Sequence, residues 1–121
     1  MTSERKTCLF CKISDKAIPS KMVYEDDSVF AIEDINPQAP VHLLIIPKNH
    51  IESLLTLNQE NETIIGQLGH LLSIASILAK KMALQNNGFR TVINSGTGAG
   101  QSVPHLHLHL LGGRPFQWPP G

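Results

Sequence analysis

The sequence has little charge, few aromatic side chains and only two cysteines, and these shortages narrow the class of protein. Charged residues make up 17% of the 121 residues, and ten basic residues balance ten acidic ones. A protein that binds nucleic acid without sequence preference needs a basic surplus, which this chain lacks. No apolar run approaches the roughly 18 residues of a membrane span, and the first ten residues lack the apolar stretch of a secretion signal. We therefore expect a cytoplasmic protein with neither a nucleic-acid partner nor a membrane partner.

The length is that of a single domain, so we expect one domain over residues 1–121, with a flexible tail at about 1–7 and a C-terminal tail at 112–121. Apolar residues at helical spacing predict one long helix from about 61 to 85. The other expected elements are a short helix or turn within 10–21 and strands at 22–24, 29–32, 41–47, 89–94 and 105–111. Strands in hairpin-like succession around one long helix indicate an α+β domain with a mostly antiparallel sheet.

Three of the six histidines stand in the stretch "PHLHLHLL", at His105, His107 and His109. Alternate residues of a strand share a face, so the three imidazoles should form a row while the leucines between them face the core. Burying three unpartnered imidazoles would be costly, so the pattern favours a function. Two uses remain open, namely binding a metal and attack on phosphorus by a neutral imidazole, with a covalent intermediate that water later cleaves.

A glycine-rich loop, "NSGTGAGQSV", leads directly into the histidines. Glycine lets backbone N–H groups converge on an anion, and Gln101 and Ser102 can add side-chain donors. A glycine loop that runs into a row of histidines predicts a phosphate cradle with a nucleophile at its edge.

The stretch "QSVPHLHLHLL" resembles the motif of the histidine triad (HIT) family, and "DINPQAP", "HLLIIPKNHI" and "WPPG" resemble its HINT branch, the purine nucleoside phosphoramidases. The resemblance covers roughly residues 8–121. It implies an antiparallel β-meander with one long helix and a short N-terminal helix, in a homodimer whose sheets join. It also implies hydrolysis of the P–N bond of purine nucleoside 5′-phosphoramidates, such as adenosine 5′-monophosphoramidate, which releases AMP and an amine and requires no cofactor for the chemistry.

The same resemblance implies roles for individual residues. His107 is the nucleophile that forms a nucleotidyl-histidine, His109 contacts the phosphate and supports proton transfer, and Asp34 binds the ribose hydroxyls. The amine must leave protonated, and either His109 or the phosphate itself can supply the proton. The phosphoryl oxygens are held by Ser102 and by the backbone around Gly100, Gln101 and Val103, with help from Asn94. The apolar walls around the base are Phe10, Ile13, Ile18 and Ile35. Trp118 of the C-terminal tail approaches the active site, either of its own chain or of the partner chain.

The two cysteines form a single Cys-x-x-Cys, at Cys8 and Cys11, which is typical of a metal clip or a redox pair. A structural zinc site usually has four ligands. In the wider family, members with this motif complete the set with a histidine after the third strand and the first histidine of the triad, here His50 and His105. We therefore expect a structural zinc ion, with two unligated thiols as the alternative. A structural hydrogen bond is expected for His42.

Three other activities remain open. His105, His107 and His109 can bind one ion in a metal hydrolase. The chain can be a nucleotide-binding regulatory or adaptor protein whose hydrolysis is incidental. It can also be a dinucleoside polyphosphate hydrolase, as in a related branch of the superfamily.

Overall fold

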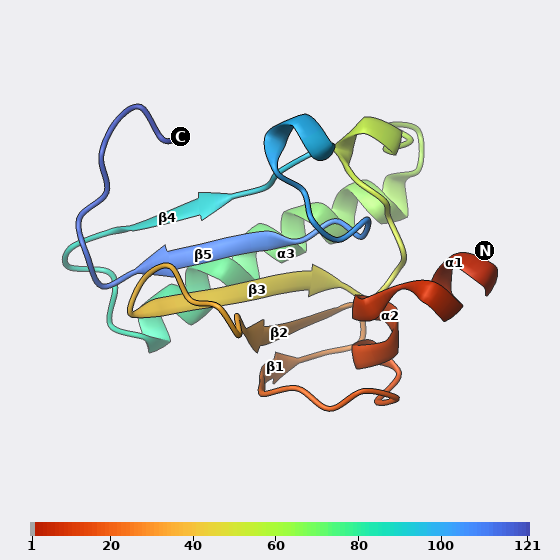
Figure 1. Cartoon of the computed structure of the whole chain (residues 1–121), viewed down its shortest axis with the longest axis horizontal. Helices are drawn as coiled ribbons and strands as arrows, with labels where there is room; N and C mark the ends of the chain where they lie inside the picture. Colours follow the sequence, from red (N-terminus) through yellow and green to blue (C-terminus); the bar gives the residue numbers. More distant parts are fainter. Residues whose placement is uncertain (1) are drawn as a thin grey trace.

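A five-stranded antiparallel sheet runs through the protein, a computed structural model that describes residues 2–121 (Figure 1). The strands are β1 (Met22–Glu25), β2 (Val29–Glu33), β3 (Val41–Pro47), β4 (Phe89–Val92) and β5 (Leu108–Gly112). The helices are α1 (Thr2–Thr7), α2 (Leu9–Ser14) and α3 (Glu62–Lys81), with short 3-10 turns η1 (Leu54–Thr56) and η2 (Thr97–Ala99). The predicted α+β class, with one long helix and a short N-terminal helix, is confirmed.

The strand order is β1-β2-β3-β5-β4, which differs from a simple meander at one point. After β3 the chain runs along α3 to the outer edge, forms β4, and then returns so that β5 lies between β3 and β4. The burial of the two strands accounts for this order. β5 is almost entirely buried, whereas β4 alternates exposed and half-buried residues and therefore suits an edge.

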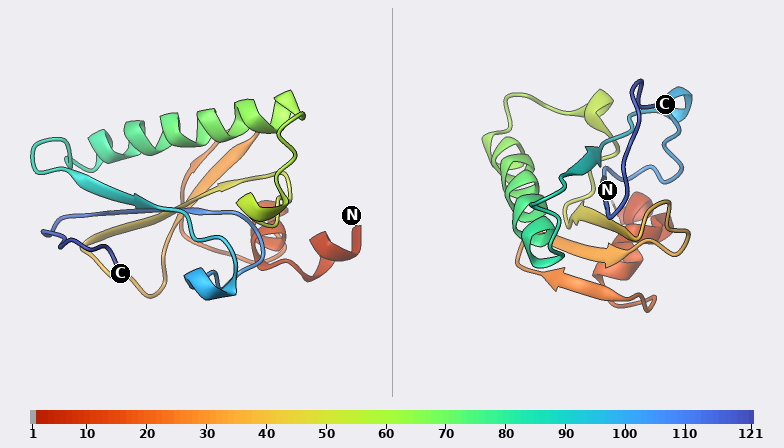
Figure 2. Two further views of the ribbon diagram at one scale, coloured as in Figure 1. Left: turned by 90° about the horizontal axis from the view of Figure 1, so that it is seen from above. Right: turned by 90° about the vertical axis from the view of Figure 1, so that its left-hand side faces the viewer.

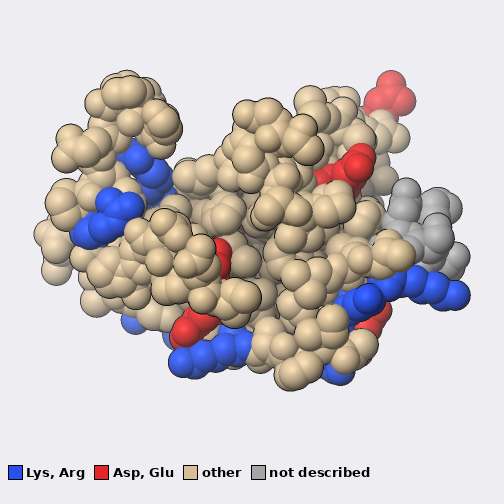
Figure 3. Space-filling view, viewed as in Figure 1, with Lys and Arg blue, Asp and Glu red and all other residues tan. Residues whose placement is uncertain are grey.

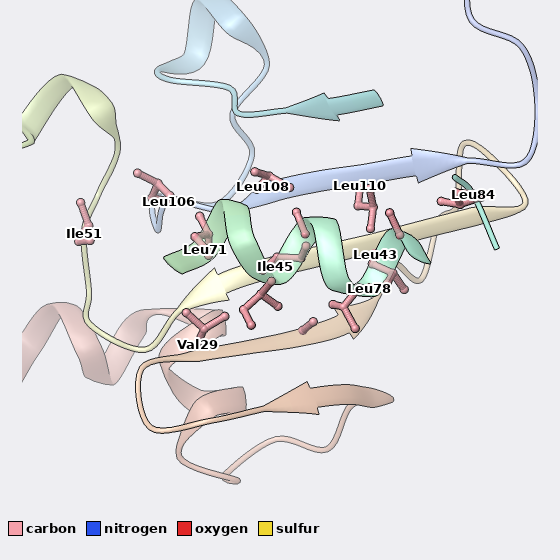
Figure 4. Packing of buried hydrophobic residues seen from close by; sticks show 14 residues of the cluster. Val29, Leu43, Ile45, Ile51, Leu71, Leu78, Leu84, Leu106, Leu108 and Leu110 are labelled. Carbon is pink, nitrogen blue, oxygen red and sulfur yellow. The ribbon is translucent and has the colours of Figure 1, made fainter. Parts of the chain in front are cut away.

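The two faces of the sheet carry different elements (Figure 2). α3 covers one face, where Leu106, Leu108 and Leu110 are fully buried in the main core (Figure 4). α2 covers part of the other face and packs Phe10 and Ile13 into a second, smaller core. Because strand residues alternate between faces, the leucines fix His107 and His109 on the α2 face.

α3 begins where the sequence predicts but ends earlier than residue 85. Asn61 caps its first turn, accepting a hydrogen bond from the Ile64 N–H at 3.1 Å. At the other end Ala83 has a φ of +60°, and Leu84, with its N–H bonded to Ala79 O, turns back into the core. A non-glycine residue in this left-handed conformation prevents the helix from continuing to residue 85.

By length and composition alone, α3 is also apolar enough to cross a membrane. A helix that packs on a sheet meets the same test, and α3 places Leu71, Ile74 and Leu78 in the core against the sheet. Only 28% of its apolar window is buried, so α3 leaves apolar side chains exposed.

The N-terminal segment, predicted to be a flexible tail at about 1–7, carries the helix α1. Residues 2–7 form α1, and Arg5 holds this helix to the body by donating to Lys48 O at 3.2 Å and pairing with Asp15 at 3.0 Å. Residue 1 lies outside the described part of the chain. No apolar pattern marks α1 in the sequence, because the contacts of this helix are polar and are made to other segments of the chain.

Asp26, in the turn between β1 and β2, ties that turn to α3. Its Oδ2 accepts the Tyr24 hydroxyl at 2.6 Å and lies 2.6 Å from His70 Nε2. Its Oδ1 accepts the backbone N–H groups of Ser28 and Val29, both at 2.8 Å. Partial burial opposes ionisation of Asp26, but these hydrogen bonds outweigh it and hold the pKa of the carboxyl well below its usual value.

Asp26→Asn is expected to lower the free energy of unfolding at pH 7 by about 1–2 kcal/mol, because the charge-assisted hydrogen bonds are lost. A depressed folded pKa stabilises the fold above the unfolded pKa, near 4 for Asp, and this contribution disappears as the pH falls towards the folded pKa. Urea unfolding at pH 7 and pH 3 should therefore show less acid sensitivity in the variant than in the wild type. The exposed neighbour Asp27 supplies the control, Asp27→Asn. Equal acid sensitivity of Asp26→Asn and the wild type would contradict this account.

Candidate active site

A cavity of about 530 Å³ opens on the face opposite α3, and its size is that of a small-molecule site. It lies among α2, the segment before β1, the ends of β2 and β3, and the segment that leads into β5. Figure 3 views this face, where most of the surface is uncharged and acidic side chains lie beside its hollowed centre. The walls are largely apolar, and the polar lining includes Ser20, Asp34, Ser102, His107 and His109.

Most of the residues predicted to contact substrate line this cavity: Phe10, Ile13, Ile18, Asp34, Ile35, Ser102, Val103, His107 and His109. Asn94, Gly100, Gln101 and Trp118 do not line it, and Trp118 is 81% exposed on the tail. The sequence analysis missed Leu9, Pro19, Ser20, Lys21, Ile32, Glu33 and Leu44. Ile32 and Leu44 could have been predicted from the sequence, because strand alternation places them on the α2 face with Phe30 and Ile46.

The three histidines do not form one exposed row. The strand begins only at Leu108, so His105 and His107 precede it, and both are buried. Their rings separate, because His105 turns towards the cysteines while His107 and His109 stay together with ring centres 5.0 Å apart. The prediction that the leucines face the core is confirmed, whereas the three imidazoles do not stand in one row because His105 turns towards the cysteines.

His107 is held in one tautomer by the backbone. Its Nδ1 lies 2.8 Å from the carbonyl oxygen of His105, and a carbonyl only accepts, so Nδ1 carries the proton. The lone pair of the neutral ring is therefore at Nε2. The ring of Phe10 packs edge-on against His107 with centres 5.0 Å apart. His107 thus has the protonation and the fixed orientation that a nucleophile needs.

His42 and His109 form a second pair with defined tautomers. The Gln38 N–H donates to His42 Nδ1 at 3.0 Å, so the proton of neutral His42 is at Nε2. That Nε2 lies 2.9 Å from His109 Nδ1 and 3.3 Å from Asp34 Oδ2. His109 Nδ1 must then accept, which leaves an N–H at its Nε2. The structural hydrogen bond expected for His42 exists, and its partner is a residue of the triad.

Burial keeps this pair neutral. Desolvation, reinforced by the nearby His107 and His42, lowers the pKa of His109 to about 4. Burial also lowers the pKa of His42, although the Asp34 carboxylate acts in the opposite direction. At neutral pH His109 therefore offers a donor N–H at Nε2.

The glycine loop is shaped from within by Gln101. Its Oε1 accepts the Gly96 N–H at 2.8 Å, and its Nε2 donates to Glu52 O at 2.8 Å and to Val103 O at 2.9 Å. Gly100, with a φ of +93°, ends the η2 turn in a conformation that favours glycine. The amide of Gln101 therefore holds the loop closed, and its predicted contact with phosphate stays a prediction.

The two cysteines meet His50 and His105 in a compact cluster, with their ligand atoms all within 4.8 Å of one another. Cys8 Sγ lies 3.2 Å from His105 Nδ1, and Cys11 Sγ lies 3.3 Å from His50 Nδ1. Burial, together with the neighbouring Cys8, raises the pKa of the Cys11 thiol to about 12, so a thiolate here needs a cation beside it.

The hydrogen bonding of His105 fits this cluster to a metal. Its Nε2 lies 2.7 Å from the carbonyl oxygen of Pro47, so Nε2 carries the proton and the Nδ1 lone pair faces the sulfur atoms. Two cysteines and two histidines are a tetrahedral zinc set, so the predicted ligands Cys8, Cys11, His50 and His105 fit a structural zinc ion. Such an ion would join α2 to the segment that enters β5.

A second group, Asp34, His42 and His109, also has its ligand atoms within 4.8 Å, but it does not fit a metal. The nitrogen of His42 that faces this group carries the proton, because Gln38 occupies the other nitrogen. A metal-hydrolase site with the three triad histidines on one ion is wrong as well, since His105 Nδ1 faces the cysteines.

Comparisons with known proteins agree with this geometry. The model of the HIT domain matches residues 15–116. A 14 kDa zinc-binding protein of Zea mays is 48% identical over the whole of both chains. An uncharacterised HIT-like protein of Synechocystis is 50% identical over 93% of this chain and 96% of its own length.

Among solved structures, a HIT family hydrolase from Legionella pneumophila superposes with a TM-score of 0.89 at 48% identity, covering 95% of this chain and all of that one. These matches support a general hydrolase class and a zinc site. Since the domain model spans most of the sequence and the solved relative shares the fold nearly end to end, the chain belongs to the HIT domain family.

Proposed function

We propose that this protein hydrolyses the P–N bond of purine nucleoside 5′-phosphoramidates through a nucleotidyl-histidine on His107. The observation that carries the proposal is the tautomer of His107, whose proton is fixed on Nδ1 by the His105 carbonyl and whose lone pair is at Nε2. This ring lines a cavity of about 530 Å³ together with an apolar wall and a carboxylate.

Each part of a nucleotide has a counterpart in the cavity. Phe10, Ile13 and Ile18 supply apolar surface for a purine ring. Asp34 suits the ribose hydroxyls, because its Oδ1 accepts the Asn36 N–H at 2.8 Å and this bond fixes the carboxylate at the cavity wall. Ser102 and Val103, which follow the glycine loop, line the cavity together with His107 and His109, and this is where we place the phosphoryl group.

The chemistry follows from the two tautomers. His107 Nε2 attacks phosphorus and forms an N–P bond, while the P–N bond of the substrate breaks and its electron pair leaves with the amine. The Nε2–H of His109 is the donor that protonates the amine. Water then cleaves the histidine–phosphorus bond and returns a proton to Nε2 of His109, which releases the nucleoside monophosphate and restores both histidines.

The test is direct detection of the intermediate. Wild-type protein is mixed with adenosine 5′-monophosphoramidate, quenched in base within milliseconds because phosphohistidine is labile in acid, and analysed by peptide mass spectrometry. We expect an AMP adduct on the peptide that carries His107, and none with adenosine, which has no phosphorus. Steady turnover without an adduct on that peptide would refute the covalent route. Adduct formation without turnover would instead favour a nucleotide-binding regulatory protein.

We also propose a homodimer whose sheets join across β4. β4 is an edge strand of the sheet, and Phe89 at its start is 42% exposed. On α3, Leu72 and Ile77 are 55% and 47% exposed. A second copy of the chain would cover this apolar surface and pair the open edge. The two buried thiols favour the reducing cytoplasm as the place of action.

A further inference from the structure

The C-terminal tail is bonded to the loop that carries Asp34, beside which it leaves β5 (Figures 1 and 2). Arg114 Nε donates to the Gln38 carbonyl oxygen at 3.0 Å. Gly113 makes the turn before it with a φ of +91°, and a Cβ at this position would lie 2.9 Å from Pro40 Cβ. The tail therefore packs on the loop closely as well as bonding to it.

The guanidinium of Arg114 is itself held in place. Its NH1 donates to Pro115 O at 2.9 Å, and its central carbon lies 4.3 Å from the centre of the Phe116 ring. Arg90 lies 5.0 Å from the same ring and donates to Gln117 O at 2.9 Å. Both arginines thus fix the tail, but of the two only Arg114 bonds to Gln38.

The backbone of Gln38 is held by hydrogen bonds on two sides. Its carbonyl oxygen accepts from Arg114, and its N–H donates to His42 Nδ1 at 3.0 Å. The Gln38 side chain also donates to Asn36 O at 3.0 Å within the same loop. The placement of this one residue determines whether His42 Nδ1 has a donor to accept from.

We propose that Arg114 is a positioning residue: by holding Gln38 it keeps His42 and His109 in the tautomers that leave the N–H of His109 at Nε2. The kinetic consequence rests on the proposed function, whereas the tautomers themselves do not.

The two rings must change together because one proton lies between them. The Asp34 carboxylate, 3.3 Å from His42 Nε2, favours a proton on that nitrogen, but if the Gln38 N–H moves away His42 can also carry its proton on Nδ1 and present a lone pair at Nε2. His109 Nδ1, 2.9 Å away, then has to donate to it, and the proton at His109 Nε2 is gone. In that state His109 can accept a proton but cannot give one to a leaving amine.

The first test reads the tautomers by long-range ¹H–¹⁵N NMR of the histidine rings in the full-length protein. We expect the wild type and Arg90→Ala to show His42 and His109 both protonated at Nε2. In Arg114→Ala we expect the Nδ1-protonated form of both rings to appear, and in Arg114→Lys, which keeps a donor for Gln38 O, a return towards the wild-type pattern. Identical ring spectra for Arg114→Ala and Arg90→Ala would overturn the proposal.

The second test measures cleavage of adenosine 5′-monophosphoramidate. We expect Arg114→Ala to lower kcat by about 10-fold, part of the 10²–10⁴ that a general acid supplies, and to leave KM within about threefold. Arg90→Ala should stay within about twofold of wild type. A rise in KM with unchanged kcat would assign Arg114 to substrate binding and refute the positioning role.

A backbone variant removes the donor itself. Gln38→Pro lacks the N–H, whereas Gln38→Ala keeps it and loses only the side chain. We expect the mixed tautomers in the proline variant and the wild-type pattern in the alanine variant. Should Gln38→Pro fail to fold, the arginine spectra still decide the question. If the wild type cleaves no phosphoramidate, the proposed function fails while the NMR comparison still tests the role of Arg114.

Discussion

His107→Asn should lower kcat/KM for adenosine 5′-monophosphoramidate by at least about 10⁴-fold, while the Kd for AMP stays within about threefold. The asparagine amide can still donate to the His105 carbonyl, 2.8 Å from Nδ1 in the wild type, so the backbone around the site should be retained. What disappears is the lone pair that would bond to phosphorus. The measurements are steady-state cleavage and AMP titration by calorimetry.

His70→Asn is the matched control, because His70 is a histidine on α3, the helix that covers the opposite face of the sheet. We expect this control to cleave at the wild-type rate at a temperature where it is folded. A kcat/KM of His107→Asn within tenfold of the wild-type value would show that His107 is not the nucleophile. Loss of AMP binding together with activity would mean that the substitution had damaged the pocket.

Removal of zinc should lower Tm by about 10 °C or more. The expected ion connects α2 to the segment before β5 through Cys8, Cys11, His50 and His105, so its loss uncouples two distant parts of the chain. A loss of about 3 kcal/mol corresponds to this shift in a chain of this size. Metal analysis should find one zinc per chain, and calorimetry should show the lower Tm after treatment with a strong chelator.

Cys11→Ser provides the internal comparison. It should have a lowered Tm that the chelator no longer changes, because the cluster has lost one of its two sulfur ligands. Wild-type protein treated with zinc-saturated chelator should keep its Tm, which excludes an effect of the chelator itself. A wild type that contains no metal and keeps its Tm under chelation would leave the two cysteines as free thiols.

The histidine stretch shows how far sequence periodicity reaches. The alternation correctly placed Leu106, Leu108 and Leu110 in the core. It did not reveal that the strand starts at Leu108, because an extended segment alternates in the same way without a hydrogen-bonded partner. His105 departs from the row because its partners, Cys8 and the Pro47 carbonyl, come from distant parts of the chain. Only the resemblance to the HIT family could link His105 to the cysteines.

Other features could not be predicted from the sequence, because they depend on single backbone groups. The tautomer of His42 follows from the N–H of Gln38, and the role of Gln101 follows from the carbonyls of Glu52 and Val103. Backbone donors and acceptors are present at nearly every residue, so composition carries no record of which ones are used. The end of α3 at Ala83, in a conformation usually taken by glycine, was hidden for a similar reason.

The two faces of the sheet carry the candidate active site and the main hydrophobic core, respectively. The proposed substrate chemistry uses side chains on the α2 face, while the largest apolar cluster and α3 occupy the other. A substitution on the buried side of α3, such as at Leu71 or Leu78, should change the rate of thermal inactivation without altering turnover per folded molecule. Residues of α3 can therefore change during evolution, altering thermal stability or oligomeric state, while the reaction stays the same.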